Sequence, residues 1–355
     1  MIKNIDINGK TVLVTGAAGF IGSHFIKFLL NLGVIEKIIG IDNMNDYYDV
    51  SLKEERLQAI SLADEKDKFR LIKEDISDKQ IVEDVMKQYH PEIVVNLAAQ
   101  AGVRYSIEHP NVYIESNIIG FFNILEACRH SQEDSEHRVE HLIYASSSSV
   151  YGNNANFPYC VEDKTDTPVS LYAATKKSNE LMAYTYAKLF GIPATGLRFF
   201  TVYGPQGRPD MAYYSFADKL RNGETIKIYN YGKCKRDFTY IDDIVDGIAA
   251  VMQKQPDQNE EGVRYKIYNL GNSHPESLLD FVNILQEELV YAGVLPDDFD
   301  FESHKEYVAM QPGDVETTFA DISESRDDFG FAPKTSLREG LRKFVKWYAK
   351  HSLKK

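Results

Sequence analysis

The feature that most constrains the fold is a glycine-rich segment near the start of the sequence, TVLVTGAAGFIGSHF at residues 11–25. Gly16, Gly19 and Gly22 follow an apolar run that predicts a strand and precede a pattern that predicts a helix. In a dinucleotide-binding turn, the first glycine permits a tight bend, the second lets the backbone approach a diphosphate, and the third permits close helix–strand packing. The segment therefore predicts the first βα unit of a dinucleotide-binding fold.

An acidic residue, Asp42, ends the next predicted strand at residues 37–42. A carboxylate at this place accepts hydrogen bonds from both ribose hydroxyls and repels a 2′-phosphate, so the sequence favours NAD over NADP as the cofactor. Asp75 and Ile76 follow the third predicted strand and are expected to flank the adenine. The residues expected to contact the cofactor are Gly16, Gly19, Phe20, Ile21, Gly22, Asp42, Asn43, Asp75, Ile76, Leu97, Ala98, Ala99, Tyr172 and Lys176.

Short β-branched runs alternate with helical patterns through the first two-thirds of the sequence. The runs predicted as strands are 11–16, 37–42, 69–75, 92–99, 141–146 and 195–200. They are apolar on both faces, as expected for strands that are covered by helices on each side. The pattern predicts an α/β fold with a doubly wound parallel Rossmann sheet.

The alternation ends after Phe200, where glycine, proline and tyrosine become frequent. Residues 238–252 predict a late helix and 265–272 a strand that returns to the sheet. Amphipathic helices are expected over 277–289 and 336–351. The apolar face of the last helix comprises Leu337, Leu341, Phe344, Val345 and Tyr348.

A chain of 355 residues usually exceeds what one core can hold, so we expect two lobes. The first is an NAD-binding Rossmann domain of residues 1–200 together with 238–272. The second is a smaller α/β lobe of residues 201–237 and 273–351, which we expect to bind the substrate.

Tyr172 and Lys176 are four residues apart and so lie on one face of a predicted helix. A free phenol has a pKa near ~10 and is a poor base at neutral pH. We expect Lys176 and the positive nicotinamide ring to favour the phenolate, which makes Tyr172 a candidate catalytic base. Lys176 can also hold the nicotinamide ribose.

Four serines in a row, residues 146–149, follow the fifth predicted strand. A hydroxyl that faces Tyr172 can bind the substrate oxygen and relay its proton. We assign this role to Ser147, while Ser148 and Ser149 are expected as neutral donors to the substrate. Ser146 is expected to serve packing or to contact the cofactor.

Two predicted helices, 112–128 and 171–190, are apolar on nearly all sides. Such a helix is buried on several sides, either in the core of the protein or between two subunits. We expect a homodimer in which these helices pair with their symmetry mates.

The net charge of −13 argues against nucleic acid or an anionic membrane as the main partner. No apolar run reaches the ~18 residues of a membrane-spanning helix, and the first residues do not resemble a signal peptide. The three cysteines are widely spaced and are expected to be reduced, which suggests a cytoplasmic protein. The histidines lack the spacing of a metal site, so no metal is expected.

With these motifs in place, the sequence resembles the extended short-chain dehydrogenase/reductase family and, within it, nucleotide-sugar epimerases of the UDP-glucuronate 4-epimerase type. The resemblance covers nearly the whole chain. It rests on TGAAGFIGSH, DNMNDYYDVSLKEERL, NLAAQAGVRYSIEHP, YASSSSVYG, SLYAATKKSNELMA, LRFFTVYGPQGRPDMA and YNYGKCKRDFTYIDDI.

The resemblance implies Tyr172 as the base, Lys176 as its partner and Ser147 as the hydroxyl relay. It also implies that Arg236, and with it Arg208, contacts the substrate diphosphate. The chain departs from its relatives at two places. Thr201 stands where galactose-type epimerases usually have asparagine, and Gln311 stands where many relatives have arginine.

The implied activity is NAD-dependent C4 epimerisation of a UDP-sugar through a transient 4-keto intermediate. Related dehydratases and decarboxylases have acids after the active hydroxyl, whereas this chain has Ser148 and Ser149. We therefore expect no elimination chemistry. Ser148, Ser149 and Thr201 could hold the carboxylate of UDP-glucuronate, and Arg208 could bind either the carboxylate or the diphosphate. UDP-glucose or UDP-N-acetylglucosamine 4-epimerase, a uronate decarboxylase and a non-catalytic NAD-sensing protein remain alternatives.

Overall fold

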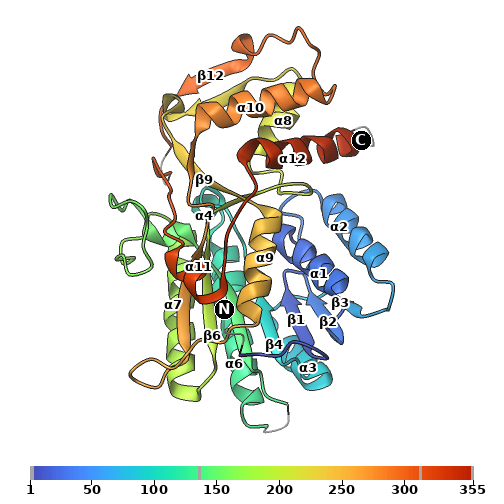
Figure 1. Ribbon diagram of the computed structural model, residues 1–355, viewed down its shortest axis with the longest axis vertical. Helices are drawn as coiled ribbons and strands as arrows, with labels where there is room; N and C mark the ends of the chain where they lie inside the picture. The colour runs from blue at the N-terminus through green and yellow to red at the C-terminus, as the bar shows by residue number, and fades with distance from the viewer. Residues whose placement is uncertain (1–3, 135–136, 312–313, 353–355) are drawn as a thin grey trace.

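A seven-stranded parallel sheet forms the centre of the computed structural model, which describes residues 4–134, 137–311 and 314–352 (Figure 1). The strand order is β10-β6-β5-β4-β1-β2-β3. The chain order reverses between β1 and β4, and ligands of open α/β sheets bind at such a reversal. The predicted fold class is therefore confirmed. The strands are β1 (Thr11–Thr15), β2 (Lys37–Ile41), β3 (Phe69–Ile72), β4 (Ile93–Asn96), β5 (His141–Ser147), β6 (Ala194–Phe199) and β10 (Tyr265–Leu270).

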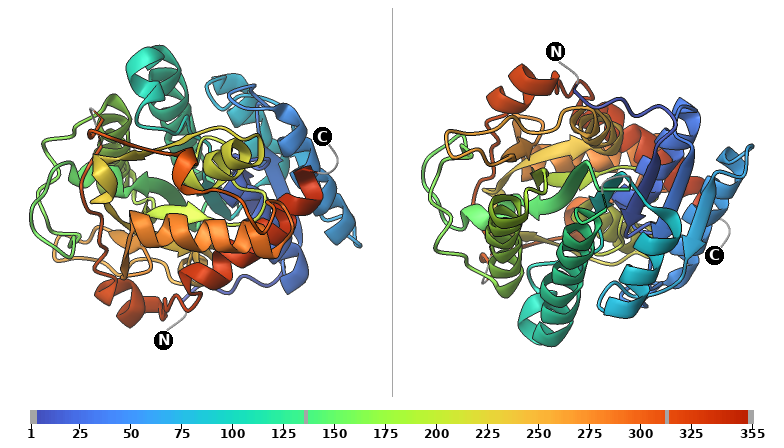
Figure 2. Two further views of the ribbon diagram at one scale, coloured as in Figure 1. Left: turned by 90° about the horizontal axis from the view of Figure 1, so that it is seen from above. Right: turned by 90° about the horizontal axis from the view of Figure 1, so that it is seen from below.

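Helices cover both faces of this sheet, as a doubly wound fold requires (Figure 2). One face carries α1 (Phe20–Leu32), α2 (Val50–Ala63) and α9 (Ile241–Met252), and the other carries α3 (Lys79–Tyr89), α6 (Phe121–Ser131) and α7 (Leu171–Phe190). Within β1, Val12 and Val14 pack on the first side and Leu13 on the second. Each strand is thus buried on both faces, which explains the continuous apolar runs in the sequence.

Short polar residues and glycines set the helix ends. Ser170 caps α7 by accepting a hydrogen bond from the Ala173 amide, and Asp78 caps α3 by accepting one from Gln80. Gly33 and Gly191 end α1 and α7 in the left-handed conformation, which glycine adopts without steric cost.

The predicted helix over 112–128 is present, but it is not a regular α-helix. After the short α4 (Tyr105–Glu108), the chain forms α5 (Pro110–Tyr113), a π-helical segment η1 (Ile114–Gly120) and α6 in unbroken succession. Asn117 in η1 is buried, and its side chain bonds both the amide and the oxygen of Gln100. We attribute the wider turn to these contacts, which anchor the helix to the loop after β4.

Most of the remaining elements form a second lobe at the top of Figure 1. A three-stranded sheet has the order β11-β9-β7, and β8 pairs with β12. Residues 238–240 were expected in a helix but complete β9, because they pair with β7, and α9 begins only at Ile241. The strands of this part are β7 (Thr201–Tyr203), β8 (Ile226–Tyr229), β9 (Lys235–Tyr240), β11 (Pro275–Ser277) and β12 (Lys305–Val308). Its helices are α8 (Ala212–Arg221), α10 (Leu278–Tyr291) and α12 (Leu337–Ser352), whereas α11 (Ser323–Phe329) packs against β10 at the edge of the central sheet (Figure 1).

The apolar face predicted for the last helix is confirmed, since all five of its residues are buried in α12. The helix packs against α10 and also reaches α2, where Trp347 and His351 both bond the carboxylate of Glu55. Across the described residues, no helix is long and apolar enough to cross a membrane.

Candidate active site

A cavity of about 890 Å³ lies at the carboxyl ends of the central strands and extends under the second lobe. All residues that the sequence predicted to bind cofactor or substrate line it, from Gly16 at one end to Arg236 at the other. Its volume falls at the upper end of the range usual for small-molecule sites. The sequence motifs are thus brought together in one place.

The glycine-rich loop leaves no room for side chains. A Cβ on Gly16 would lie 2.9 Å from the Ala98 amide nitrogen, and one on Gly22 would lie 2.1 Å from the Gly16 oxygen. Gly16 also has a φ of +69°, which disfavours other residues. Helix α1 begins directly after Gly19 without a side-chain cap, so its first N–H groups are available for an anion.

Asp42 lies next to the glycine-rich loop at the cofactor end of the cavity. Its carboxylate accepts hydrogen bonds from the amides of Ala18 at 3.0 Å and Met44 at 2.9 Å. Lys53, which the sequence analysis missed, places Nζ 3.6 Å from the same carboxylate and is almost fully buried. Burial lowers the pKa of Lys53, and Asp42 acts in the opposite direction. The uncapped helix, the glycine cradle and a fixed carboxylate together fit a dinucleotide with a free ribose.

The candidate catalytic side chains come from β5 and the first two turns of α7. Lys176 Nζ donates a hydrogen bond of 2.9 Å to the main-chain oxygen of Ala145. Burial lowers the pKa of Lys176 to about 8. Burial also raises the pKa of Tyr172, while a hydrogen bond with Ser147 and the nearby charge of Arg208 lower it. Without a nicotinamide ring in the cavity, burial is the largest influence on the pKa of Tyr172.

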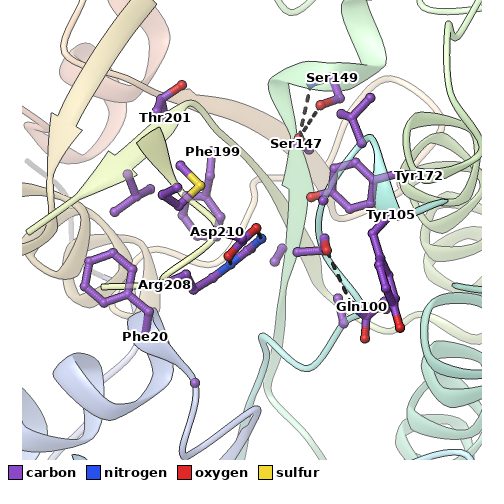
Figure 3. Close-up of a pocket in the computed structure, with 18 of the residues that line it drawn as sticks. Phe20, Gln100, Tyr105, Ser147, Ser149, Tyr172, Phe199, Thr201, Arg208 and Asp210 are labelled. Atoms are coloured by element: carbon purple, nitrogen blue, oxygen red, sulfur yellow. Dashed lines mark hydrogen bonds and ion pairs between the residues drawn. The ribbon is translucent and has the colours of Figure 1, made fainter. Parts of the chain in front are cut away.

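The four serines have different environments. Ser146 donates a hydrogen bond of 2.7 Å to Glu180, which places it in a packing network behind the site. Ser147 faces Tyr172 and donates to the Ser149 hydroxyl at 3.1 Å (Figure 3). Ser148 begins a short 3₁₀ turn that Ser147 caps through the Ser149 amide. The run therefore ends a strand, presents one hydroxyl to the tyrosine and starts a turn.

A buried ion pair supports this strand end from behind. Arg198 on β6 bonds both oxygens of Glu180, at 2.8 and 2.9 Å, and also donates to the Tyr151 hydroxyl. Both charged side chains are almost fully buried. The signals in the sequence were an arginine inside an apolar strand and a glutamate one helical turn after Lys176, and neither was recognised.

Arg208 and Asp210 lie on the wall opposite the serines and extend toward Tyr172 (Figure 3). Two hydrogen bonds join the guanidinium to the carboxylate, at 3.0 and 2.6 Å. The positions after Ser147 carry no acid, but the loop before α8 brings a carboxylate, Asp210, to the cavity wall. Although burial opposes it, the Arg208 guanidinium holds the pKa of Asp210 below its ordinary value.

The other predicted substrate residues lie farther along the cavity. Thr201, at the start of β7, lies beyond Phe199 on the side away from the serines (Figure 3). Arg236 on β9 bonds the main-chain oxygens of Lys235 and Glu316 in the second lobe. The two arginines thus occupy different parts of the cavity wall.

Gln311, which replaces the arginine frequent in relatives, has a buried side-chain oxygen without a hydrogen-bond partner among the described residues. It does not belong to the residues found lining the cavity. The next two residues lie outside the described part of the chain, and Asp314 then pairs with Arg104 at 3.0 Å.

Arg56 on α2 is a further residue that the sequence did not reveal. It is fully buried, and its hydrogen bonds use all three guanidinium nitrogens. They reach the oxygen of Ala18 in the glycine-rich loop, the hydroxyl of Tyr48, and the oxygens of Gln206 and Gly207 just before Arg208. This one side chain joins the cofactor loop to the loop that carries Arg208.

The sheet order, the glycine-rich loop and the Tyr–Lys pair beside a serine define an extended short-chain dehydrogenase/reductase. The family model described as GDP-mannose 4,6 dehydratase matches residues 13–344, and the chain belongs to this family.

Individual relatives agree over almost the full length of the chain. It is 47% identical to Protein CapI of Staphylococcus aureus, over 96% of this chain and 98% of the relative. It is 43% identical to UDP-glucuronate 4-epimerase 4 of Arabidopsis thaliana, over 98% of this chain and 77% of the relative. Among solved structures, the UDP-glucuronic acid 4-epimerase of Bacillus cereus, in complex with UDP-glucuronic acid and NAD, is similar with a TM-score of 0.81 and 31% identity. That similarity covers 96% of this chain and 99% of the other.

Proposed function

We propose that this protein is an NAD-dependent UDP-glucuronate 4-epimerase, which interconverts UDP-glucuronate and UDP-galacturonate. The observation that carries the proposal is the position of Arg208, whose guanidinium lies close enough to Tyr172 to lower the pKa of the phenol. A positive charge beside the reacting tyrosine suits a sugar whose C6 is a carboxylate. The relatives with this activity support the same conclusion.

In the proposed reaction, Tyr172 takes the proton of the sugar C4 hydroxyl and returns it after the sugar has turned over. Ser147, which is hydrogen-bonded to Tyr172, holds the C4 oxygen and keeps it in line with the phenol. Lys176 lies buried beside them and supplies positive charge near the developing phenolate. The glycine-rich loop, Asp42 and Lys53 would hold NAD, which would supply a reversible hydride acceptor for C4.

Epimerisation is favoured over elimination because Asp210, an acid that lines the cavity, is paired with Arg208. Asp210 is hydrogen-bonded through both oxygens to Arg208 and its pKa is lowered, so it stays ionised and cannot donate a proton. The residues after Ser147 are Ser148 and Ser149, which are too weakly acidic for proton transfer at C5. The keto sugar is therefore left to take the hydride back on its other face.

We assign the carboxylate of the sugar to Arg208, with Ser148, Ser149 and Thr201 as neutral donors around it. Arg236 is left for the diphosphate, because it lies on the second-lobe wall of the cavity. This choice resolves the two roles that the sequence left open for Arg208. In this assignment Arg208 also holds the carboxylate firmly. A firm hold is needed because a β-keto acid loses CO₂ when its C–carboxylate bond aligns with the carbonyl.

We further propose that residues 1–200 with 238–272 bind NAD and that 201–237 with 273–351 bind the nucleotide sugar. Phe122 on α6 and Leu181, Leu189 and Phe190 on α7 are exposed on one chain, which supports a homodimer through these helices. All three cysteines are free, in keeping with a cytoplasmic enzyme. The product, an activated uronic acid, would serve polysaccharide biosynthesis.

The test is to incubate the NAD-loaded protein separately with UDP-glucuronate, UDP-glucose and UDP-N-acetylglucosamine and to resolve the products by NMR. We expect UDP-galacturonate from the first and little conversion of the other two. Preferential conversion of a neutral sugar would contradict the assignment of glucuronate, a pentose product would indicate a decarboxylase, and inertness toward all three would leave a non-catalytic NAD-binding protein.

A further inference from the structure

The guanidinium of Arg208 is fixed by a second residue that no motif singled out. Asp210 accepts hydrogen bonds from Nε at 3.0 Å and from Nη2 at 2.6 Å, so it occupies one whole edge of the guanidinium. The edge that carries Nη1 is therefore turned away from Asp210. A planar group held along one edge can present the other edge in only one direction.

Asp210 is itself held from across the cavity. The Tyr47 hydroxyl donates a hydrogen bond of 3.2 Å to Asp210 Oδ2, the same oxygen that Arg208 Nη2 bonds. The Tyr47 ring lies against Tyr105, with ring centroids 4.7 Å apart, and Arg208 lies over the same ring at 5.9 Å. Tyr47 comes from the loop that follows the cofactor residue Asp42, so the cofactor side of the cavity supports the sugar side.

We propose that Asp210, oriented by Tyr47, is a positioning residue that determines how Arg208 holds the substrate carboxylate and thereby which reaction the 4-keto sugar undergoes. The inference rests on the proposed function, because it concerns the carboxylate of UDP-glucuronate. Asp210 fixes the guanidinium plane, and the free edge keeps the carboxylate out of line with the C4 carbonyl.

The reaction that this arrangement prevents is decarboxylation of the keto acid. In it the C5–carboxylate bond breaks and CO₂ leaves. The bonding electron pair passes to C5 and is delocalised onto the C4 carbonyl oxygen as an enolate, which then takes a proton at C5. Loss of the carboxylate needs rotation of the C5–carboxylate bond toward the carbonyl π system. An arginine free to swing would permit that rotation.

The electrostatics support a positioning role. Without Asp210, a cation close to Tyr172 would attract the carboxylate strongly in any orientation, since charge attraction alone has little directionality. With Asp210 present, the Arg208–Asp210 pair is nearly neutral. It offers the substrate carboxylate the two or three N–H donors of Arg208 that Asp210 does not use. The orientation of the bound carboxylate then depends on the directions of these donors more than on charge.

The experiment compares the full-length, NAD-loaded wild type with Asp210→Ala and Asp210→Asn. UDP-glucuronate is the substrate, and the ratio of decarboxylated product to UDP-galacturonate is measured by NMR. We expect the ratio to rise at least tenfold in Asp210→Ala. A smaller rise is expected in Asp210→Asn, which keeps one acceptor for the guanidinium. Affinity for UDP-glucose, measured by calorimetry, should change less than twofold, because that sugar has no carboxylate to hold.

Tyr47→Phe and Tyr291→Phe form a matched pair of variants, each of which loses one phenol oxygen. Tyr47→Phe removes the bond to Asp210 and should raise the product ratio modestly. Tyr291 ends α10, is 84% exposed and does not line the cavity, so Tyr291→Phe should leave the ratio unchanged. NAD content and melting temperature report whether each variant is folded.

Two results would overturn the inference. The first is an unchanged product ratio in folded Asp210→Ala, and the second is an equal loss of affinity for both sugars without decarboxylated product. If the wild type does not convert UDP-glucuronate, the proposed function fails, and the inference fails with it. If the wild type converts it and Asp210→Ala gives either of the two results above, only the inference fails.

Discussion

Lys176 Nζ is hydrogen-bonded at 2.9 Å to the main-chain oxygen of Ala145, which lies on β5 two residues before Ser147. This contact ties the first turns of α7 to the strand end from which the serines extend. It also keeps the ammonium group in a fully enclosed place, where burial lowers its pKa to about 8. The protein without cofactor therefore holds a charge that its surroundings disfavour.

The enclosed charge predicts that Lys176→Met stabilises the NAD-free protein at pH 7. Below pH 8 the lysine is protonated in both states, and a shift from 10.5 to about 8 corresponds to a cost of about 3 kcal/mol in the folded state. Losing the bond to Ala145 offsets about 1 kcal/mol. We expect a net gain of roughly 2 kcal/mol in the free energy of unfolding in urea.

The pH dependence gives this prediction a second check. Between about pH 8 and 10.5 the folded state loses the lysine proton first, the unfolded state binds more protons, and wild-type stability rises with pH. The advantage of Lys176→Met should therefore shrink at pH 9.5. A variant that is less stable than wild type at pH 7 would show that the lysine is not disfavoured by its site.

Tyr172→Phe should abolish epimerisation while leaving UDP-sugar binding nearly intact. Only the oxygen that bonds Ser147 is removed, and the ring keeps its edge contact with Tyr113 at 6.0 Å. Loss of a general base typically costs ~10²–10⁴ in rate. Turnover within tenfold of wild type, measured by NMR, would remove Tyr172 from the role of base.

Asp42→Ala should weaken NAD retention and relax the choice of cofactor. The ribose loses its carboxylate acceptor, the amides of Ala18 and Met44 lose theirs, and Lys53 is left without its anionic partner. An unpaired cation beside the ribose favours a 2′-phosphate. We expect less NAD after gel filtration and a lower ratio of the NADP to the NAD dissociation constant, and unchanged values of both would count against the ribose role.

Phe122→Asp should give a folded monomer if α6 and α7 form the dimer interface. The side chain is 41% exposed in the single chain, so the charge does not enter the core of the protein. Leu62→Asp is a suitable control, because Leu62 is 79% exposed on α2, away from both helices. Light scattering after gel filtration measures the mass, and circular dichroism measures folding. A wild-type monomer, or a variant that stays dimeric, would place the interface elsewhere.

Local patterns in the sequence were sufficient for much of this architecture. The helix over 171–190 and the buried face of the last helix were both predicted, because each has a clear cap or an unbroken apolar period. The residues expected at the cofactor were found on one cavity because they follow parallel strands, whose carboxyl ends lie along the same edge. These features depend on short stretches of chain and on the order of strands.

The errors arose where distant segments meet. Asn117 lies in a π-helical turn within the predicted helix, and its side chain bonds the loop after β4, a contact that no periodicity reveals. Asp210 reaches the cavity wall beside Arg208 only through the fold of the loop before α8. Lys53 looks like any polar residue on a helix until Asp42 is placed beside it.

Arg56 has a consequence for redesign of this scaffold. Its donors are shared among oxygens of the glycine-rich loop, Tyr48 and the loop before Arg208, an arrangement that lysine, with three donors on one nitrogen, cannot reproduce. A specificity loop grafted from another enzyme into residues 204–211 would have to present its main-chain oxygens to this arginine at the same positions. Otherwise the graft would leave a buried cation short of acceptors and disturb the cofactor loop as well. Substrate exchange in this fold is therefore best attempted with positions 48 and 56 transplanted together with the loop.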